Sequence, residues 1–292
     1  MVYVYGLVAA CLLGLGFVLQ QHAAERAPTA DMLKFRLLLH LVRVRTWRYG
    51  IAFMVAGQLC SVLALGMGDL SAIEPLLTTN LLFALFLARR LSGQRLGWSG
   101  WAGALLLSAG VGLFILAAQP RSGTANAGLL RVWLVFGAVL GVALVMVVIA
   151  RHLPFFEEPP LLAAAAGALY GLQDALTRMS STIASDHGAL SLLVHWQPYA
   201  IVALAVTGLM LVQSAFEAGP LRMSLPSLTA AEPLVGIVCA ILLLGDRLRV
   251  SPIALAGETI GLVAVIVGVF ILGRHPAMPT GKPSQGSGVA AV

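Results

Sequence analysis

Long apolar stretches separated by short polar gaps run along almost the whole chain. Each stretch approaches the roughly 20 residues that a helix needs to cross a hydrocarbon core about 30 Å thick. The stretches cover residues 2–21, 49–67, 71–88, 98–117, 129–150, 160–178, 196–215, 224–244 and 253–272. This pattern predicts an all-α, polytopic membrane bundle of nine transmembrane helices.

Two further segments leave a tenth span open. Residues 30–48 mix Lys and Arg with apolar residues, which is typical of an amphipathic helix lying in the membrane interface. Residues 182–195 contain Asp186 and His187 and are marginally apolar. Either segment could form a short additional span, which would give ten helices in place of nine.

Composition places the chain in the membrane class. Of 292 residues, 59% are hydrophobic and 10% are charged, whereas a soluble domain carries roughly 25% charged residues. The net charge of +6 does not indicate nucleic acid as a partner, because the basic residues lie in gaps between apolar stretches. The expected partners are the lipid bilayer and a small-molecule or cation substrate. No cofactor is expected.

The distribution of basic residues predicts how the chain is oriented. With nine spans, the gaps on one side and the C-terminal tail hold thirteen Lys and Arg residues, against five on the other side. The positive-inside rule then puts the N-terminus outside and the C-terminus in the cytoplasm. Arg outnumbers Lys sixteen to two, which favours a bacterial inner membrane as the location. The first apolar stretch lacks a preceding basic region, so it is interpreted as a permanent helix and not as a signal peptide.

The two halves of the chain resemble each other at nearly constant spacing. The paired landmarks are Glu74-Pro75 with Glu232-Pro233 at an offset of 158, Arg90-Leu91 with Arg247-Leu248 at 157, Gly112 with Gly268 at 156, and Gln58 with Gln213 at 155. Four helices on each side of a connecting helix would give the two copies opposite orientations. Such inverted repeats are typical of carriers that alternate a central site between two faces.

The repeat defines the expected organisation of the chain. Residues 1–118 form the first repeat with helices 1 to 4, and residues 119–158 contain connecting helix 5. Residues 159–273 form the second repeat with helices 6 to 9. Residues 274–292 are rich in Pro, Gly and Ser and are expected to be a disordered cytoplasmic tail.

The second half contains Glu232-Pro233, then Gly245-Asp246-Arg247-Leu248 and a glycine-rich last helix. These motifs resemble those of the drug/metabolite transporter superfamily, of EamA-like type. In the first half, Gly57-Gln58 followed by Leu-Ser-Ala-Ile-Glu74-Pro75-Leu is similar to the NIPA-like magnesium transporter branch. The resemblance implies a secondary transporter of a small solute that works by alternating access. It leaves a magnesium or other divalent-cation transporter as an alternative.

Glu74-Pro75 and Glu232-Pro233 are the strongest candidates for the substrate or ion path. Counting along the helices places each carboxylate roughly 21–22 Å from one end of its span, well inside the hydrocarbon core. A carboxylate there is costly unless it is protonated, paired or hydrated, and the following proline removes a backbone donor. Each Glu could bind a proton, a cation or a cationic substrate, or could instead cap its helix or pair with an arginine.

Other polar residues inside the apolar stretches are weaker candidates. Asp174 lies four residues before Arg178, so the simplest interpretation is an ion pair within one helix, with a place along the path as the alternative. Gln58 and Gln213 could line the path, although hydrogen bonds between helices are the more frequent role of such amides.

Three pairs of glycines have the spacing that lets membrane helices approach closely. They are Gly137 with Gly141, Gly167 with Gly171, and Gly257 with Gly261. We expect these residues in helix packing, within the chain or in a homodimer. The metal ligands, if any, are not indicated by the sequence.

The motifs that the sequence lacks narrow the function. It contains no Gly-x-x-x-x-Gly-Lys-Ser/Thr phosphate loop, no His-Glu-x-x-His and no Gly-x-Ser-x-Gly. We therefore expect no enzymatic activity, and transport without nucleotide hydrolysis by a phosphate loop. A membrane scaffold or enzyme that handles cell-envelope lipids remains an alternative from a different functional class.

Overall fold

The computed structural model describes residues 2–26, 33, 35–67, 76–91, 97–119, 128–152, 158–249 and 251–274. This part of the chain is helical and has no β-strand element. Its elements are α1 (Val2–Ala24), α2 (Phe35–Arg43), α3 (Arg45–Met67), α5 (Asn80–Leu91), α6 (Trp98–Ala118), α7 (Leu129–His152), α8 (Glu158–His187), the 3-10 helix η2 (Ala189–Val194), α9 (Gln197–Ala218), α10 (Leu221–Cys239), the π-helix η3 (Ala240–Leu244) and α11 (Pro252–Arg274).

Six of the described helices are long and apolar enough to cross a membrane, as expected for a membrane protein. These candidate spans are Tyr3–Ala24, Trp98–Ala118, Leu129–His152, Gln197–Ala218, Leu221–Leu244 and Pro252–Leu272. The other three expected spans contain the helices α3, α5 and α8, and the span 71–88 is interrupted by a turn at residues 78 and 79. These three helices are not both long enough and apolar enough to be counted with the six. For example, α5 has only 12 described residues, and α8 carries both Asp174 and Arg178.

The two marginal segments do not form an additional long helix in the described residues. Residues 35–43 form α2, whose nine residues span only about 13 Å. This helix is amphipathic as expected, because Leu37, Leu38 and Leu41 are buried while Arg36 and Arg43 are exposed. Residues 182–187 continue α8, and the chain then turns through η2. In the residues that the structure describes, neither segment forms a separate tenth span.

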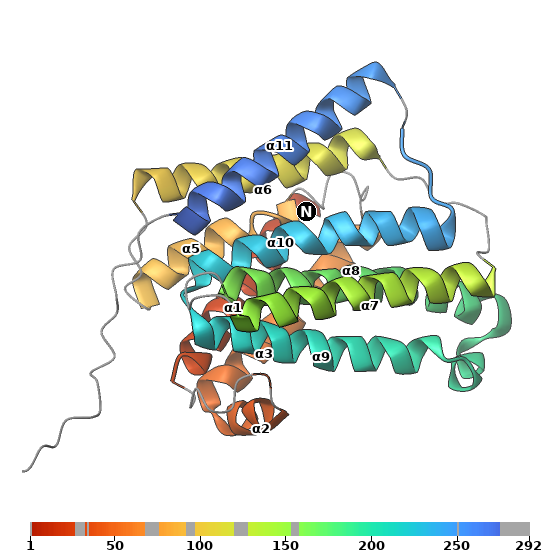
Figure 1. Ribbon diagram of the computed structural model, residues 1–292, viewed down its shortest axis with the longest axis horizontal. Coiled ribbons are helices and arrows are strands. Elements are labelled where there is room, and N and C mark those ends of the chain that lie inside the picture. Colours follow the sequence, from red (N-terminus) through yellow and green to blue (C-terminus); the bar gives the residue numbers. More distant parts are fainter. Residues whose placement is uncertain are drawn as a thin grey trace, which may run out of the picture.

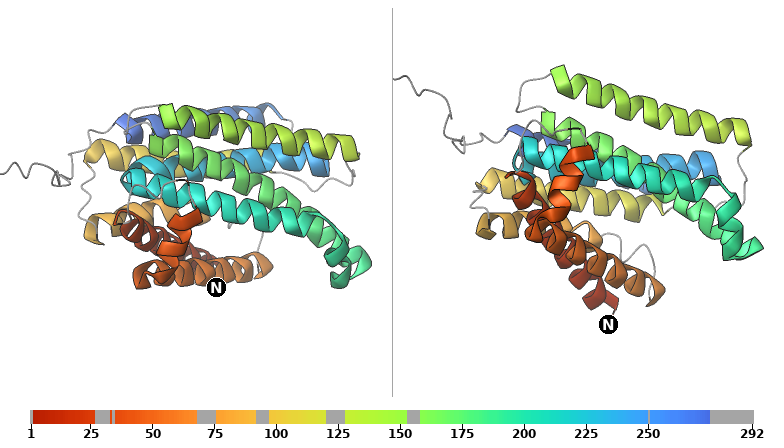
Figure 2. Two further views of the ribbon diagram at one scale, coloured as in Figure 1. Left: turned by 60° about the horizontal axis from the view of Figure 1, so that its bottom comes forward. Right: turned by 90° about the horizontal axis from the view of Figure 1, so that it is seen from below.

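Each helix packs mainly against a few others. Helix α1 packs mainly against α3 and then α5, whereas α8 packs mainly against α10 and α9. Helices α6 and α11, the last of each half, pack mainly against each other and lie together along one side of the bundle (Figure 1). Helix α7 packs on α8 from the outside (Figure 2).

Consecutive helices from α6 to α11 run in alternating directions along the bundle (Figure 1). We name the two ends of the bundle after the two ends of α11. The Pro252 end holds the last residues of α6, α8 and α10 and the first residues of α7 and α9. The Arg274 end holds the last residues of α5, α7 and α9 and the first residues of α6, α8 and α10.

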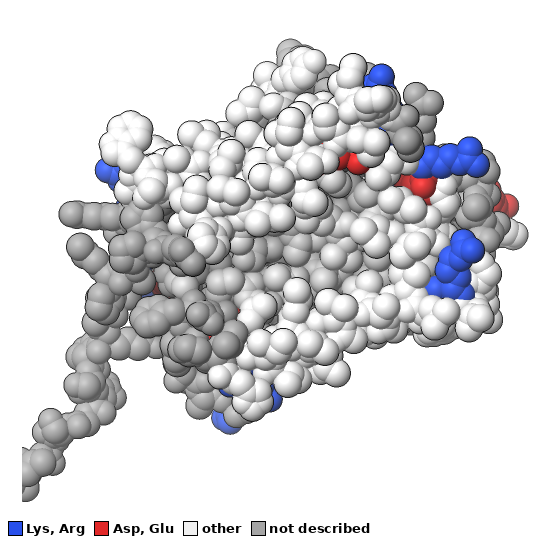
Figure 3. Space-filling model, turned by 45° about the horizontal axis from the view of Figure 1, so that its top comes forward, with Lys and Arg blue, Asp and Glu red and all other residues white. Residues whose placement is uncertain are grey.

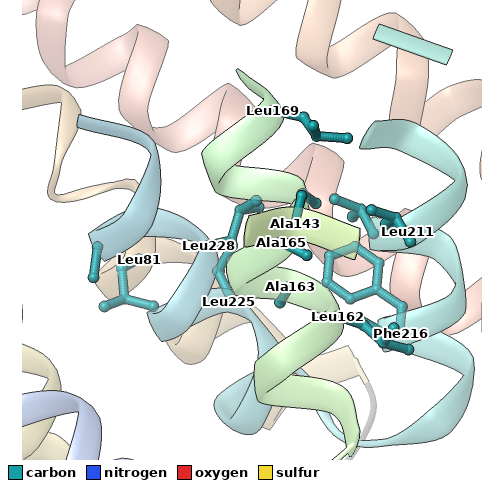
Figure 4. Packing of buried hydrophobic residues seen from close by; sticks show 14 of the residues in the cluster. Leu81, Ala143, Leu162, Ala163, Ala165, Leu169, Leu211, Phe216, Leu225 and Leu228 are labelled. Atoms are coloured by element: carbon teal, nitrogen blue, oxygen red, sulfur yellow. The ribbon is translucent and has the colours of Figure 1, made fainter. Parts of the chain in front are cut away.

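The largest hydrophobic core surrounds α8. Leu162 and Leu169 of α8 are buried between α9, which contributes Leu211 and Phe216, and α10, which contributes Leu225 and other apolar residues (Figure 4). The ring of Phe216 also meets Phe17 of α1 edge to face at 6.3 Å, which connects the two halves. Many large apolar residues of α7 and α11 face outward, as lipid-facing helices require.

Candidate functional site

The contact between α8 and α10 brings two backbones unusually close. A Cβ added to Gly167 would lie 2.8 Å from the carbonyl oxygen of Leu228, and one added to Gly171 would lie 2.5 Å from the carbonyl oxygen of Glu232. No side chain larger than hydrogen fits at such distances. The spacing of four residues between the two glycines thus places α10 directly against α8.

This contact fixes the position of Glu232 on α10. Helix α10 begins at Leu221, three residues earlier than expected, so Glu232 is the twelfth residue of the 24-residue span Leu221–Leu244. Pro233 follows within the helix and has no N–H to donate to the carbonyl of Thr229. A half-buried carboxylate thus lies near the middle of a candidate membrane span, beside a break in the helical hydrogen bonding.

Among the described residues, Glu232 has no hydrogen bond and no ion pair. Its electrostatic neighbours are Asp174 and Tyr170, which lie one turn apart on the facing side of α8. Gln173 lies beside them, and its Oε1 is buried without a hydrogen-bond partner. The structure therefore brings Glu232 and Asp174 together, although they are 58 residues apart in the sequence. Two carboxylates with neighbouring amide and hydroxyl oxygens form an arrangement that can attract a proton or a cation.

A polar stripe runs along the exposed face of α8 from this pair toward the Pro252 end. We define the polar stripe as the exposed residues Asp174, Thr177, Arg178, Ser181, Thr182 and Ser185. They recur every three or four residues, so they share one face of the helix. Most of the hydroxyls donate to backbone carbonyls of α8 itself, as Thr177 does to Gln173 at 2.8 Å. The opposite faces of α8 are buried in the core. Such a face is suited to water and not to lipid.

Arg178 in this stripe pairs with Asp246, in the segment that follows η3. Its guanidinium donates from Nη1 to Oδ2 at 2.8 Å and from Nη2 to Oδ1 at 3.4 Å. The Asp246 side chain is 1% exposed, whereas that of Arg178 is 46% exposed. The sequence interpretation considered Asp174 as the partner of Arg178. Spacing within one helix could not have identified Asp246, because it lies 68 residues further along the chain, in the segment after η3.

The matching amides Gln58 and Gln213 lie in different surroundings. Gln213 is buried, accepts a hydrogen bond from Trp47 Nε1 at 3.2 Å and donates to Gln20, so it connects α9 with α3 and α1. This is the helix-to-helix bonding that its residue type favours. Gln58 is exposed on α3. Gln20 and Trp47 were not among the sequence candidates, although Gln20-Gln21 is a visible polar interruption at the end of an apolar stretch.

Further polar residues are buried near the Arg274 end. They come from α1, α9 and α10 and include Gln21, Ser214, Glu217, Arg222, Ser224 and Ser227. The hydroxyl of Ser214 accepts a hydrogen bond from the backbone N–H of Leu33 at 3.0 Å. Sequence reasoning missed this group, because Glu217 and Arg222 lie just outside the expected stretches 196–215 and 224–244. The tertiary structure instead encloses them.

The three glycine pairs differ in what they contact. A Cβ on Gly261 would lie 2.8 Å from the carbonyl oxygen of Gly110, and one on Gly257 would lie 2.8 Å from Ala117, so this pair joins α11 to α6. A Cβ added to Gly137 or Gly141 would meet no atom within 4 Å, so this pair makes no close helix contact within the described part of the chain. Its packing in a homodimer stays a prediction.

Two candidates, Glu74 and Pro75, lie outside the described residues. Thr78 follows them closely and exchanges hydrogen bonds with Ser108 of α6. The hydroxyl of each residue donates to the backbone carbonyl of the other at 3.3 Å. This joins the segment before α5 to α6. Within the described part of the chain, no group of three or more His, Cys, Asp or Glu side chains could hold a metal ion.

Comparisons with known proteins add one full-length similarity. The chain is 29% identical over 281 residues to an uncharacterized protein of Corynebacterium glutamicum, and the match covers 95% of this chain and 96% of the relative. No family model matches the chain. No solved structure matches it.

Proposed function

We propose that this chain is a secondary transporter of a small solute, of drug/metabolite transporter type, that works by alternating access in a bacterial inner membrane. The proposal rests mainly on Glu232. Its carboxylate lies near the middle of a candidate span and has no hydrogen bond or ion pair among the described residues. Intramembrane carboxylates are costly and usually mark a substrate or ion pathway. Asp174 and the polar stripe support this assignment, because they offer a wettable route from the Pro252 end to Glu232.

The helix packing supports an inverted repeat. In the proposed alignment α1, α3, α5 and α6 correspond to α8, α9, α10 and α11, with α7 as the connecting helix. Helix α1 packs mainly against α3 and α5, and α8 packs mainly against their counterparts, α9 and α10. The last helices of the two repeats, α6 and α11, pack against each other. We accordingly retain nine transmembrane helices in two repeats, with Glu74 as the counterpart of Glu232.

The basic residues support the proposed orientation. Arginines lie at the Arg274 end of several helices, with Arg89 and Arg90 in the last turn of α5 and Arg151 in the last turn of α7. The positive-inside rule makes the Arg274 end cytoplasmic and the Pro252 end external. The N-terminus then lies outside and the polar stripe of α8 opens to the external side.

Transport of a divalent cation is the second candidate function. Mg²⁺ prefers oxygen ligands and retains several waters, so few protein ligands are required. The neighbouring Asp174 and Glu232 carboxylates and the unpartnered Oε1 of Gln173 are ligands of this kind. This candidate function predicts that Mg²⁺ and Mn²⁺ each bind saturably and that the two ions compete for the same site.

Ligand screening followed by flux measurement tests the proposal. Purified protein is first screened by thermal shift against metabolites, organic cations and divalent cations, because a ligand of the native state raises its apparent stability. Each stabilising compound is then assayed for flux in proteoliposomes. Glu232→Gln should abolish flux, while Asp186→Asn, at an exposed acid near the end of α8, should leave flux unchanged. Flux through Glu232→Gln at the wild-type rate would remove this carboxylate from the mechanism.

A further inference from the structure

The segment after α10 connects two parts of the bundle at the Pro252 end. We define the strap as Gly245–Arg249. On one side, Asp246 of the strap binds Arg178 of α8. On the other side, the backbone N–H of Arg249 donates to the carbonyl of Ala118, the last residue of α6, at 3.0 Å. Arg249 Nη1 also donates to Gln119 Oε1 at 3.3 Å. The strap thus ties α6 to α8.

The strap bridges two groups of helices that otherwise contact each other little. Helices α6 and α11 pack extensively against each other, and their contacts with α5 and α10 are few. Helices α8, α9 and α10 form the opposite group around the main core. Figure 3 views the molecule from the side on which α6 and α11 lie, with carboxylate and arginine atoms close together toward one end. Separation of the two groups would break the strap contacts and the limited packing of α6 and α11 against α5 and α10.

The helix that leads into the strap ends in an irregular turn. Helix α10 continues as the π-helix η3, and the backbone N–H of Asp246 donates to Ala240 at 3.2 Å. Gly245 follows with φ at +69°, a conformation that side chains rarely adopt. π-Helical turns occur frequently at functional sites. This turn positions the Asp246 carboxylate toward α8, and it is a short element that could adjust as the strap moves.

The ion pair itself is asymmetric in a way that suits repeated opening. The Asp246 side chain is enclosed, so its charge strongly favours a bound cation. The Arg178 side chain is nearly half exposed, so its guanidinium could leave Asp246 and remain in water. Opening leaves the enclosed carboxylate without its cation, which is unfavourable, so the paired state is favoured and the carboxylate attracts the guanidinium back.

We propose that the Arg178–Asp246 pair is the external gate of the transporter. With the pair formed, the polar stripe is exposed, but the strap holds α6 and α11 against α8 and α10 and restricts access from the stripe to the half-buried Glu232. With the pair broken, the strap leaves α8, and Glu232 becomes accessible from the external solution. This inference rests on the proposed transport function, but the gate can be tested without knowing the substrate.

A native thiol close to the strap reports gate opening. Cys239 is fully buried and lies directly before η3, whereas Cys11 and Cys60 can be replaced by alanine. In that background, the rate at which a charged, membrane-impermeant thiol reagent modifies Cys239 is measured in proteoliposomes. Asp246→Asn and Arg178→Gln should each raise the rate about tenfold, the factor that corresponds to loss of one charge-assisted contact. The exchanged pair Arg178→Asp with Asp246→Arg should restore slow modification.

Controls separate gating from damage. Arg131→Gln removes an exposed arginine at the same end and should leave the Cys239 rate unchanged. The thermal midpoint of each variant shows whether it is folded, and if a single variant unfolds, the exchanged pair alone decides the outcome. Wild-type rates in folded single variants, or fast modification in a folded exchanged pair, would overturn the gate. If Cys239 responds as expected but no solute is transported, the proposed function fails while the gate stands.

Discussion

Gly171 on α8 and Glu232 on α10 meet so closely that a Cβ added to the glycine would lie 2.5 Å from the glutamate carbonyl oxygen and equally close to the backbone nitrogen of Gly236. The contact is made by backbone on both sides, so neither helix can yield by changing a rotamer. The position of the Glu232 carboxylate therefore depends on a residue that carries no functional group.

The first prediction concerns this contact. Gly171→Ala should destabilise the protein by about 1–3 kcal/mol, because the added methyl group forces α8 and α10 apart. Thermal unfolding in detergent measures the effect. Gly137→Ala is the matched control. It also changes one of two glycines spaced four residues apart, but a Cβ there would meet no atom within 4 Å. Equal stability of the two variants would contradict the observed packing.

A second prediction separates the function of Glu232 from its effect on stability. Glu232→Gln should raise the thermal midpoint, by the equivalent of about 1–3 kcal/mol, because it replaces an unpaired carboxylate inside a span with a neutral group of similar shape. Transport should be lost in the same variant. A fall in stability would show that the carboxylate is a structural group, and the proposed path would then lose its main support.

The third prediction compares the two matching amides. Gln213→Ala should destabilise the protein by about 1–2 kcal/mol, because it removes hydrogen bonds that connect α9 to Trp47 and Gln20. Gln58→Ala should change stability by no more than about 0.5 kcal/mol, since Gln58 is exposed. Denaturation of both variants under one set of conditions provides the comparison. Similar losses in both would be incompatible with the different surroundings of these amides.

A fourth prediction concerns orientation in the membrane. A fluorescent protein that folds only in the cytoplasm should be active when fused after residue 274, because the basic gaps lie at that end. Alkaline phosphatase, which is active only outside the cytoplasm, should report activity when inserted after residue 124, in the gap between α6 and α7. The reverse pattern of activities would invert the orientation and make the Arg178–Asp246 gate cytoplasmic.

The positions of most helices followed from hydropathy alone. The start and end of α6, α7, α9 and α11 agree closely with the expected stretches, because crossing a bilayer demands a long uninterrupted apolar segment. The candidate Glu232 could also be identified from the sequence, since a charged residue inside such a segment is conspicuous. The segment 182–195 was harder to interpret, because the end of α8 and a short 3-10 helix leave no comparable signal.

What the sequence could not determine was the partner of each residue. Gly137 with Gly141 and Gly167 with Gly171 have the same local pattern, yet only the second pair meets another helix. Gln58 and Gln213 are likewise the same residue type, but only Gln213 is enclosed. The physical reason is that helical periodicity and membrane solubility are local properties of a segment. Burial, pairing and the choice of Asp246 for Arg178 depend on which helix lies opposite, and only the tertiary packing decides that.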